Sequence, residues 1–496
     1  MVNISELLRL AAMRWPEREC LVFGDQSYTY SEFGRLVETR AARLEKLGIG
    51  VAQPVLIIGE NSSELLATYL ALASLGALNI PLSSMSTVSE ASQIALRARA
   101  SVLIFSDGRS DFANSVLDVT EGLSTLVPLE PQGAEGNPQG SRSLRTAPVG
   151  GDSPAMVIFT SGSTGSPKGC IKTHGNLVAH MVNAQIAMPR VADDRELYVI
   201  PLSGIGLVNF ALGGFLVGSL LVLDRFYADA LFPALEAQRI TRVFLPPTML
   251  HAALAVEGSA RVDLRTLTRV DTGYEMSLNL RAQILERFGA IVHYGYGSSE
   301  GTISYANVEQ FESDPQCVGQ VAGLDELAVV LPAGEPAAAG VTGEIVGRGP
   351  SVFAGYFGDD ELTAETLRDG WYHTGDLGWM DERADLHFAG RLKDMIKTGG
   401  MNVAAAEVEA AIVRHPSVSE VSVVGIPDDR WGEAVVAAVV AAPGQRVSEE
   451  ELQEFARDEL PGYKRPKRYV LLDALPTNPG GKIAKGVLRE SILNEK

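Results

Sequence analysis

The stretch IFTSGSTGSPKG, residues 158–169, combines glycines, hydroxyl side chains and one lysine at the end of an apolar run. Glycine permits backbone conformations that turn amide N–H groups toward anionic oxygens. The hydroxyl groups add further donors, and the lysine adds a positive charge. These residues are Thr160, Ser161, Gly162, Ser163, Thr164, Gly165, Lys168 and Gly169. This composition predicts a loop that wraps a polyphosphate.

The same stretch does not fit the P-loop pattern G-x-x-x-x-G-K-[ST], because Gly169 follows Lys168 and two residues separate Gly165 from the lysine. A P-loop nucleotide hydrolase is therefore disfavoured. A Gly/Ser linker is disfavoured too, because a strand precedes the loop and Pro-Lys-Gly ends it. Nothing in the chain resembles a kinase catalytic loop, and formation of ADP rather than AMP would identify a phosphotransferase.

Two further polar clusters carry carboxylates. Residues 296–300 (YGSSE) follow an apolar run, so Glu300 is expected beyond the carboxyl end of a strand, where open sheets bind ligands. Residues 370–376 (GWYHTGD) place Asp376 in a tight turn, from which a carboxylate can accept both hydroxyls of a ribose. Each cluster taken alone is equally compatible with a structural turn.

Basic residues in glycine-rich turns recur toward the C-terminus. Arg391 and Lys393 precede the sequence IKTGGMNV at 396–403, and Lys482 lies in the turn 478–483. Each of these lysines is also compatible with an ordinary solvated surface charge.

The elements that must position these clusters follow from periodicity and flanking residues. Apolar, β-rich runs alternate with helical stretches, which predicts an α/β protein with a largely parallel sheet. Asn61 is expected to cap a helix that runs to about residue 75, with Glu64 at the capping-box position. The expected strands are residues 54–59, 103–105, 155–159, 219–223 and 242–245, and the expected helices are residues 229–238 and 279–288.

The alternation of apolar strands with helices changes near Arg391. The later chain predicts a small α+β unit, and a Pro/Gly/Ser-rich interval at 128–154 predicts a surface loop or connector. The unit is expected to contain a helix at 404–414, strands at 418–426 and 434–441, a helix at 449–460 and a strand at 469–472.

In this order and spacing, the clusters resemble the adenylate-forming enzyme superfamily of acyl- and aryl-CoA synthetases, stand-alone adenylation domains and firefly luciferase. The resemblance runs from the sequence YTYSEF at 28–33 to Lys482. It implies a large, subdivided N-terminal domain at 1–390, a small mobile C-terminal lid domain at 391–496 and a hinge near Lys393. It also implies a two-step reaction: a carboxylate attacks the α-phosphate of Mg-ATP to give an acyl-adenylate and pyrophosphate, and a thiol then displaces AMP.

The resemblance also implies roles for single residues. Residues 160–168 would cradle the β- and γ-phosphates, Glu300 would hold Mg²⁺, and Ser299 would touch the α-phosphate. Lys482 would bridge the carboxylate and α-phosphate oxygens during adenylation. Lys168, Ser299, Glu300 and Lys482 are thus the expected catalytic residues. The remaining nucleotide contacts are expected from Gly273, Tyr274, Glu275, Tyr296, Asp376 and Arg391.

Some positions depart from the family pattern. Many relatives have an aromatic-histidine pair after the Pro-Leu at 201–202, where this chain has Ser203 and Gly204. The usual gate of the acyl pocket is therefore missing or rebuilt. Ser299 replaces the commoner threonine and keeps the hydroxyl, and Ala405 stands where proline is usual.

The identity of the accepting thiol depends on the lid. The basic segment 463–468 (YKRPKR) matches positions that meet the phosphates of coenzyme A in CoA-forming relatives, and Trp431 resembles the aromatic residue at their pantetheine tunnel. A solvated basic turn and a core tryptophan are the alternatives. CoA is the expected acceptor, and an acyl carrier protein stays the alternative. The expected acceptor contacts are Gly400, Trp431, Arg465 and Lys467.

The acyl group is less closely specified. Amino-acid-activating relatives place an aspartate within the segment matching 203–210, and this chain has none there, so a buried α-ammonium would have no counter-charge. Tyr274 and Phe210 could flank a ring, which favours a bulky, mostly apolar acid: aryl, polycyclic or fatty. Small residues that would leave room for it are Gly204, Gly206, Gly295 and Gly297, although these glycines could instead only shape turns.

Composition excludes several classes of protein. The formal net charge of −19 over 496 residues argues against nucleic-acid binding, which requires a basic surface. Cys20, Cys170 and Cys317 are too few and too scattered for a disulfide framework or a metal cluster, which favours a reducing cytoplasm. Residues 197–223 lack charge but contain proline and several glycines, so we expect a strand, a loop, a buried helix and a second strand rather than a membrane span. The oligomeric state stays open, with a homodimer among the candidates.

Overall fold

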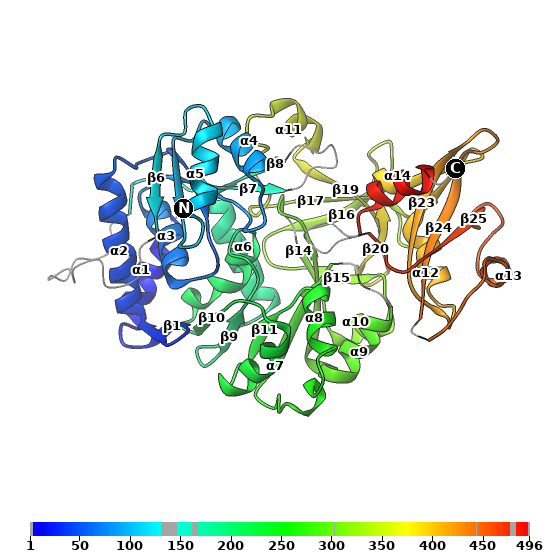
Figure 1. The fold of residues 1–496 in the computed structure, drawn as a ribbon, viewed down its shortest axis with the longest axis horizontal. Helices are drawn as coiled ribbons and strands as arrows, with labels where there is room; N and C mark the ends of the chain where they lie inside the picture. The colour runs from blue at the N-terminus through cyan, green and yellow to red at the C-terminus, as the bar shows by residue number, and fades with distance from the viewer. Residues whose placement is uncertain are drawn as a thin grey trace.

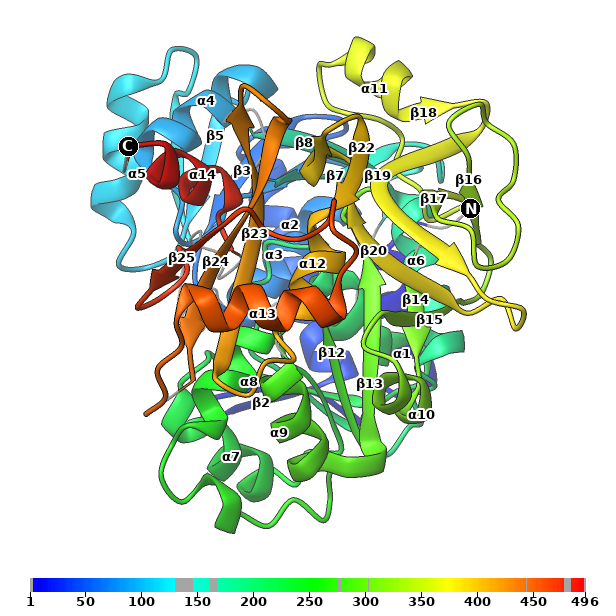
Figure 2. The same cartoon turned by 90° about the vertical axis from the view of Figure 1, so that its right-hand side faces the viewer.

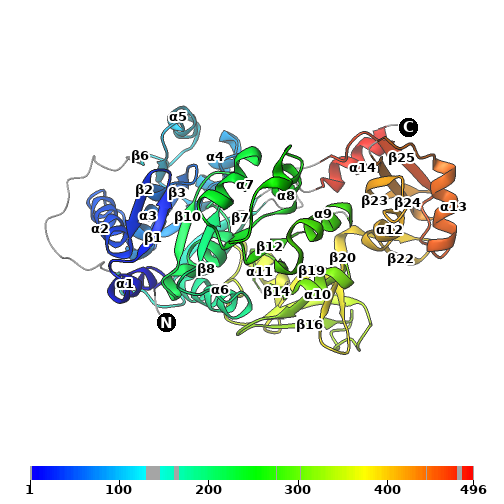
Figure 3. The ribbon, with the colours of Figure 1, turned by 90° about the horizontal axis from the view of Figure 1, so that it is seen from below.

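The structure is a computed structural model in which the described residues are 3–129, 146–160, 167–274, 276, 278–301, 303–442, 444–476 and 483–494. Two sheets with their covering helices make up the larger part of the molecule, and a third, smaller sheet lies at one end (Figure 1). The view from below places the small sheet at the same end (Figure 3). The predicted α/β fold with a smaller C-terminal α+β unit is confirmed.

A six-stranded sheet has the order β6-β5-β3-β4-β7-β8. Its strands pair in parallel except for the antiparallel hairpin of β7 and β8. Nearly every residue of β3, β4 and β5 is buried, as expected for a parallel sheet covered on both faces. The strands are β3 (Pro54–Ile58), β4 (Leu78–Pro81), β5 (Val102–Phe105), β6 (Thr125–Pro128), β7 (Pro154–Thr160) and β8 (Lys168–Thr173).

Helices cover both faces of this sheet. On one face, α4 (Val88–Ala98) and α5 (Ser110–Val119) pack on alternate strand residues such as Leu56 and Leu103. On the other face, the sheet shares one apolar core with α1 (Ser5–Arg14), α2 (Tyr30–Lys46), α3 (Ser63–Ser74) and α6 (His174–Ala187). That core also includes Leu21 and Leu221 of the second sheet, so it joins the two sheets.

The second sheet begins with parallel strands in the order β13-β12-β11-β9-β10-β1, and β2 pairs antiparallel at the edge. One face of this part is covered by α7 (Ala228–Ala237), α8 (Pro247–Leu254) and α9 (Leu278–Phe288). Its strands are β1 (Glu19–Phe23), β2 (Gln26–Thr29), β9 (Arg195–Tyr198), β10 (Leu220–Leu223), β11 (Arg242–Phe244), β12 (Arg269–Gly273) and β13 (Val292–Gly297).

Beyond β13 the sheet continues in antiparallel pairs, in the order β14, β15, β20, β19, β17 and β16, with β18 beside β19. The prediction of a largely parallel sheet is therefore right up to β13 and wrong beyond it. These strands are β14 (Ile303–Ala306), β15 (Cys317–Val321), β16 (Glu326–Val330), β17 (Gly343–Arg348), β18 (Leu367–Arg368), β19 (Trp371–Met380) and β20 (Leu386–Arg391); α10 (Val308–Ser313) and α11 (Asp360–Thr366) are the short helices of this region.

The small sheet has the order β22-β21-β24-β23, with β25 parallel to β24, and it has its own apolar cores. β20 ends at Arg391, a 3₁₀ turn covers Leu392–Asp394, and β21 begins in the small sheet. Figure 2 shows this unit in front of the larger part. Its elements are β21 (Met395–Thr398), β22 (Met401–Ala404), α12 (Ala405–Ile412), β23 (Val418–Asp428), β24 (Gly432–Ala441), α13 (Glu449–Glu459), β25 (Arg468–Leu472) and α14 (Lys485–Asn494).

The uncharged segment 197–223 forms the end of β9, a loop, a buried π-helix η1 (Leu207–Ala211), a 3₁₀ turn η2 (Gly213–Leu216) and β10. The predicted order of a strand, a loop, a buried helix and a strand is confirmed. Within the described part of the chain, no helix combines the length and apolar character needed to cross a membrane.

Two local predictions are wrong: Asp376 lies within strand β19 rather than in a tight turn, and Asn61 is not a helix cap. Asn61 does not cap α3, because Ser62 is the N-cap residue and its hydroxyl accepts the Leu65 N–H at 3.1 Å. The Asn61 amide instead donates to the carbonyls of Ile200 at 2.9 Å and Asp224 at 3.0 Å. Its side chain thus ties the ends of β9 and β10 to the start of α3.

Candidate active site

The two ends of the predicted phosphate loop lie side by side. β7 and β8 form a hairpin in which Thr160 is the register partner of Lys168, and both residues are half-buried. Ser161, Gly162, Ser163, Thr164 and Gly165 lie outside the described residues. The Lys168 ammonium lies 5.7 Å from the centre of the Tyr356 ring.

Tyr356 connects this hairpin to Glu300. Its hydroxyl donates to Glu300 Oε1 at 2.9 Å. Burial, followed by the nearby negative charge of Glu300, raises the pKa of Tyr356, so the phenol stays protonated and remains a donor. The predicted catalytic residues Lys168 and Glu300 therefore contact the same tyrosine.

An aromatic group extends the cluster toward β19. The Phe353 ring lies edge-on to Tyr356 at 4.8 Å and to Tyr372 at 5.8 Å between ring centres. The Tyr372 hydroxyl lies 3.0 Å from Ser298 Oγ, on the same short loop as Ser299 and Glu300. Ser299 itself is half-buried. The loop after β13 is thus held against β19 by packed side chains.

The predicted ribose site also forms a connected group. Tyr296 donates its hydroxyl hydrogen to Asp376 Oδ2 at 2.7 Å, and Arg391 Nε lies 3.4 Å from Asp376 Oδ1. Asp376 and Arg391 are register partners across β19 and β20. Burial raises the pKa of Asp376, and the Arg391 charge opposes that shift. The structure therefore brings together Tyr296, Asp376 and Arg391.

The end of β12 leads toward this group. A Cβ at Gly273 would lie 2.7 Å from the carbonyl oxygen of Gly295, so only glycine fits there. Tyr274 follows with φ of 67° and an exposed fraction of 50%, and its carbonyl accepts the Tyr294 hydroxyl at 2.7 Å. A positive φ is costly for a tyrosine, and such strain is commonest at functional sites. Glu275 lies outside the described residues.

The predicted acceptor residues lie in the small sheet unit. Gly399 and Gly400 form the turn between β21 and β22 with φ of 57° and 77°, and Gly399 N–H donates to the Trp431 carbonyl at 2.7 Å. The Lys467 ammonium lies 5.4 Å from the centre of the Trp431 ring. Gly400, Trp431 and Lys467 are thus close together.

Arg465 and Lys482 differ from the other residues that the sequence predicts for the C-terminal unit. The Arg465 guanidinium donates to the carbonyls of Leu460 at 2.7 Å and Arg457 at 2.9 Å, at the end of α13. This helix-terminal bonding was not foreseen from the sequence, and it engages the group that was expected to meet CoA. Lys482 lies outside the described residues.

The expected acyl region is closely packed in this structure. Phe210 of η1 stacks on Phe244 at 4.3 Å between ring centres. A Cβ at Gly206 would lie 2.6 Å from Ile200 Cδ1, and one at Gly295 would lie 3.5 Å from the Tyr305 ring. Space is open at Gly204, where an added Cβ would meet no atom within 4 Å. An added Cβ is therefore excluded at Gly206 and tolerated at Gly204 and Gly295, and the expectation that these glycines leave room for the acyl group stays a prediction.

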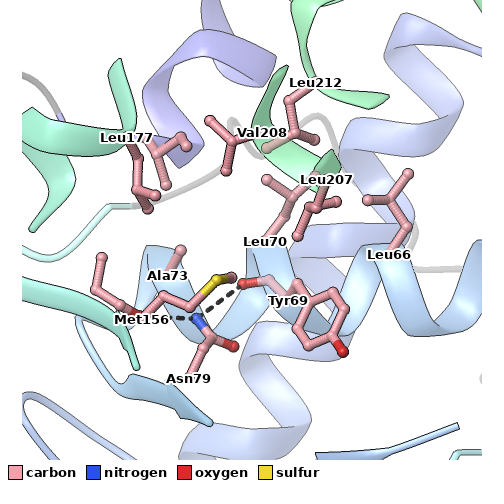
Figure 4. Close-up of a pocket in the computed structure, with 12 residues that line it drawn as sticks. Leu66, Tyr69, Leu70, Ala73, Asn79, Met156, Leu177, Leu207, Val208 and Leu212 are labelled. Carbon is pink, nitrogen blue, oxygen red and sulfur yellow. Dashed lines mark hydrogen bonds between the residues drawn. The ribbon is translucent and has the colours of Figure 1, made fainter. Parts of the chain in front are cut away.

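A small apolar cavity lies elsewhere, between α3, β7, α6 and η1 (Figure 4). Leu66 and Leu70 line it from α3, and Leu207 and Val208 line it from η1. Asn79 Nδ2 at its edge donates to the carbonyls of Tyr69 at 3.4 Å and Ala155 at 3.3 Å. None of the predicted site residues lines this cavity, so we assign it to internal packing.

Sequence reasoning missed the residues that join the clusters. Tyr356 and Phe353 lie in the apolar segment SVFAGYF, which contains no catalytic motif, and Phe244 lies in an ordinary strand. Lys172 could have been noticed, because a lysine in a strand directly after the phosphate loop breaks an otherwise buried pattern. The contacts themselves depend on segments far apart in the sequence and leave no local signal.

The group formed by Lys168, Tyr356 and Glu300 includes a carboxylate that fits a magnesium ion. No group of at least three His, Cys, Asp or Glu side chains that could hold a metal exists among the described residues. Mg²⁺ is usually bound through one or two carboxylates, with substrate phosphates and water completing its shell. A half-buried Glu300, linked through Tyr356 to Lys168 at the phosphate-loop hairpin, meets that requirement.

Two family models match the chain. The model described as AMP-binding enzyme matches residues 8–357, and the model described as AMP-binding enzyme C-terminal domain matches residues 407–482.

Individual proteins are similar over nearly the full length. A feruloyl-CoA synthase from Amycolatopsis sp is 36% identical over 494 residues, covering 96% of each chain. An indoleacetate–CoA ligase from Aromatoleum aromaticum is 33% identical over 509 residues, covering 100% of this chain and 99% of the relative. The solved structure of the amide bond synthetase McbA from Marinactinospora thermotolerans superposes with a TM-score of 0.90 at 29% identity, covering 99% of each chain. The chain therefore belongs to the AMP-binding enzyme family of the adenylate-forming superfamily, and it is an acid–thiol ligase of the acyl-CoA synthetase type.

Proposed function

We propose that this ligase activates an aryl carboxylic acid with ATP and transfers the acyl group to coenzyme A. The observation that carries the proposal is the connected set of contacts from Lys168 through Tyr356 to Glu300, beside the Tyr296–Asp376–Arg391 group. This arrangement offers a positive charge, a cation ligand and a hydroxyl-binding carboxylate within one cluster. A nucleoside triphosphate requires these three features together.

The chemistry needs no protein nucleophile. In the first step a carboxylate oxygen bonds to the α-phosphorus, the bond from that phosphorus to the bridging oxygen breaks, and pyrophosphate leaves. In the second step the thiolate sulfur attacks the acyl carbonyl, and AMP leaves with the electron pair of the broken C–O bond. Adenylation is needed because a free carboxylate would have to expel oxide, whereas AMP is a stable leaving group.

The residues act by positioning and electrostatics. We assign the loop 160–168 to the β- and γ-phosphates, Ser299 to the α-phosphate, and Asp376 with Arg391 to the ribose hydroxyls. Glu300 would hold Mg²⁺, which when bound neutralises phosphate charge. Lys482, by the family resemblance, would bridge the reacting carboxylate and phosphate oxygens.

The names of relatives and the local chemistry support an aryl acid. Feruloyl and indoleacetyl groups both contain an aromatic ring. Segment 203–210 offers no carboxylate to pair with an α-ammonium, and Phe210 and Phe244 present stacked aromatic faces. Open space at Gly204 replaces a bulky gate residue. An acid with a flat apolar ring suits these surroundings.

Coenzyme A is the proposed acceptor, and the small sheet unit is the proposed lid. Gly400, Trp431 and Lys467 lie together and combine an open turn, an aromatic face and a positive charge. We propose a hinge at Lys393, between the end of β20 and the start of β21, that carries this group to the site for the second step. Such closure steps often limit turnover.

The test is product analysis with a panel of ring-containing, fatty and α-amino acids. We expect pyrophosphate release with ring-containing acids, followed by equimolar AMP and acyl-CoA once CoA is added. ADP in place of AMP would contradict adenylation, and preference for fatty acids would contradict the aryl assignment. Transfer of the acyl group to a phosphopantetheinylated carrier protein but not to CoA would show that the carrier protein is the acceptor.

A further inference from the structure

Lys172 is an unusual residue for the centre of a strand. Its side chain is fully buried, with an exposed fraction of 0%. Removing an ammonium group from water is costly unless every donor finds an acceptor. An apolar residue at this position of β8 would carry no such cost, as Cys170 shows on the same face of the strand.

The ammonium makes three hydrogen bonds, one for each of its hydrogens. Nζ lies 3.0 Å from the Glu300 carbonyl oxygen, 3.1 Å from the Ser351 carbonyl oxygen and 3.0 Å from His180 Nε2. Burial and the Lys172 charge lower the pKa of His180, so its neutral imidazole accepts this third hydrogen. The three bonds use the full donor capacity of the ammonium, so Lys172 has none to offer a reactant.

These bonds join segments that are distant in the sequence. Lys172 belongs to β8, next to the phosphate loop; His180 belongs to α6; and Glu300 and Ser351 lie on separate loops. The Glu300 carbonyl also accepts the Phe353 N–H at 2.6 Å. Ile171, the neighbour of Lys172, exchanges backbone hydrogen bonds with residues 354 and 355 at 2.9 Å and 3.0 Å. Lys172 therefore fixes the main chain of Glu300 relative to the hairpin that carries the phosphate loop.

The side chain of Glu300 is held from the same region. Tyr356 forms an isolated β-bridge with Cys170 of β8, and its hydroxyl donates to the carboxylate. One support thus acts on the main chain and the other on the carboxylate. A shift of about 1 Å in a catalytic group is enough to lower a rate substantially.

We propose that Lys172 is a positioning residue for adenylation: by holding the Glu300 carbonyl, it keeps the Glu300 carboxylate in place beside the phosphate loop. This inference rests on the proposed function, because it assumes that Glu300 serves the ATP-dependent step. Lys172 acts through Glu300 and has no contact with a reactant.

The experiment replaces Lys172 with methionine, which keeps most of the volume and removes the three donors. We expect pyrophosphate release to fall about 10- to 100-fold with a raised Mg²⁺ requirement, from the loss of a buried hydrogen-bond group. Thioester formation from supplied acyl-adenylate should stay within about threefold, since it does not use Glu300. Hydrogen exchange of the Phe353 amide should increase, because its acceptor is no longer fixed.

Gln185→Ala is the matched control. Gln185 also belongs to α6, but its amide donates to the Arg190 carbonyl at 3.0 Å and accepts the Arg190 N–H at 3.2 Å, away from Lys172 and its partners. We expect it to alter exchange near residue 190 and to leave the Mg²⁺ titration unchanged. An equal Mg²⁺ effect in both variants, or an equal loss of both half-reactions in Lys172→Met, would overturn the proposal.

A second variant covers the case in which Lys172→Met does not fold. Lys172→Gln keeps an amide donor on a shorter side chain, so we expect an intermediate Mg²⁺ requirement. If neither variant folds, Lys172 is a requirement of the fold and the positioning role is rejected. Failure of the proposed function is distinguishable, because the unaltered protein would then release no pyrophosphate with any acid, whereas Phe353 exchange would still report on the Lys172 contact.

Discussion

Glu300 and Asp376 are both carboxylates that accept a hydrogen bond from a tyrosine hydroxyl, at 2.9 Å from Tyr356 and 2.7 Å from Tyr296. Their other neighbours differ. Arg391 lies 3.4 Å from Asp376, and such a neutralised, mostly buried carboxylate suits uncharged hydroxyl groups. Glu300 is linked through Tyr356 to the lysine of the phosphate loop, where a hard cation would sit. The surroundings of each carboxylate therefore favour a different ligand.

Glu300→Gln tests the metal assignment. The amide oxygen can still accept the Tyr356 hydroxyl, but a neutral amide is a poorer ligand for Mg²⁺. We expect the Mg²⁺ concentration for half-maximal pyrophosphate release to rise about 10-fold or more and turnover to fall. Glu326→Gln, an exposed carboxylate paired with Arg348, is the control. An unchanged titration would remove Glu300 from the metal site.

His174 provides a prediction about pH. Its buried Nδ1 accepts the Ile4 N–H at 3.3 Å, and burial lowers the pKa of His174 from 6.5 to about 4. Between these values the unfolded chain binds more protons than the folded protein, so the free energy of unfolding falls as the pH drops through this window. His174→Gln keeps an acceptor without titrating. It should remove on the order of 3 kcal/mol of that pH dependence.

Urea unfolding at several pH values between 4 and 7 measures this effect. His251→Gln, at an exposed position on α8, is the control. Parallel pH profiles for the unaltered protein and His174→Gln would contradict the prediction.

At the scale of elements, the π-helix η1 depends on a buried ion pair outside it. Arg190 binds Glu196 of β9 through two contacts of 2.7 Å and 3.0 Å and donates to the Asn209 carbonyl of η1 at 2.7 Å. A Cβ at Gly213 would lie 2.7 Å from Arg190 Cζ, so glycine is needed for the guanidinium to pass. π-Helices are rare and occur often at functional sites. This ion pair therefore sets the position of Phe210.

Arg190→Leu tests this dependence. Removing one partner leaves a buried carboxylate without its counter-charge, so we expect a loss of about 3–5 kcal/mol in the free energy of unfolding. The KM for the acid should rise while the KM for ATP stays unchanged, because η1 carries Phe210, which we propose flanks the acyl group. The double variant Arg190→Leu/Glu196→Leu should recover most of the stability but not the KM. A single variant as stable as the original protein would contradict the prediction.

At the scale of the whole molecule, the small sheet unit joins the larger part through the short turn Leu392–Asp394. We propose that this unit rotates about Lys393 and brings one surface to the site for adenylation and another for thioester formation. Substitutions on one of these surfaces should then impair one half-reaction and spare the other. Lys482→Ala should abolish adenylation and spare thioester formation from supplied acyl-adenylate. Lys467→Glu should mainly raise the KM for CoA, because contacts remote from the sulfur act as uniform binding.

The kinetics of both half-reactions with CoA and dephospho-CoA measure this separation. We expect a higher KM for dephospho-CoA than for CoA in the unaltered protein. Most of this difference in KM should disappear in Lys467→Glu. Arg446→Glu, an exposed charge reversal in the same unit, is the control. Arg465 is unsuitable for charge reversal because it binds the carbonyls that end α13. Equal loss of both half-reactions in Lys482→Ala would reject the division between faces.

The sequence by itself determined the elements and the chemistry of the loops. The apolar runs of β3, β5 and β10 and the helices α7, α9 and α13 were predicted because burial periodicity and flanking turn residues are local properties of the chain. The glycine, hydroxyl and lysine content of residues 158–169 likewise predicts a polyphosphate ligand, and that role stays a prediction. The sequence also predicts that Tyr296, Asp376 and Arg391 contact the nucleotide. The structure brings these three side chains together, and their roles stay proposals.

Tertiary structure alone decided how those pieces meet. Tyr356 reaches Glu300 across 56 residues, and Lys172 reaches Ser351 across 179, so no local pattern could indicate either contact. Asn61 was misassigned as a helix cap for the same reason: its amide found carbonyls at residues 200 and 224 that the sequence did not place nearby. Local propensity selects elements, whereas a buried polar group binds whichever partner the packed chain brings within hydrogen-bond distance.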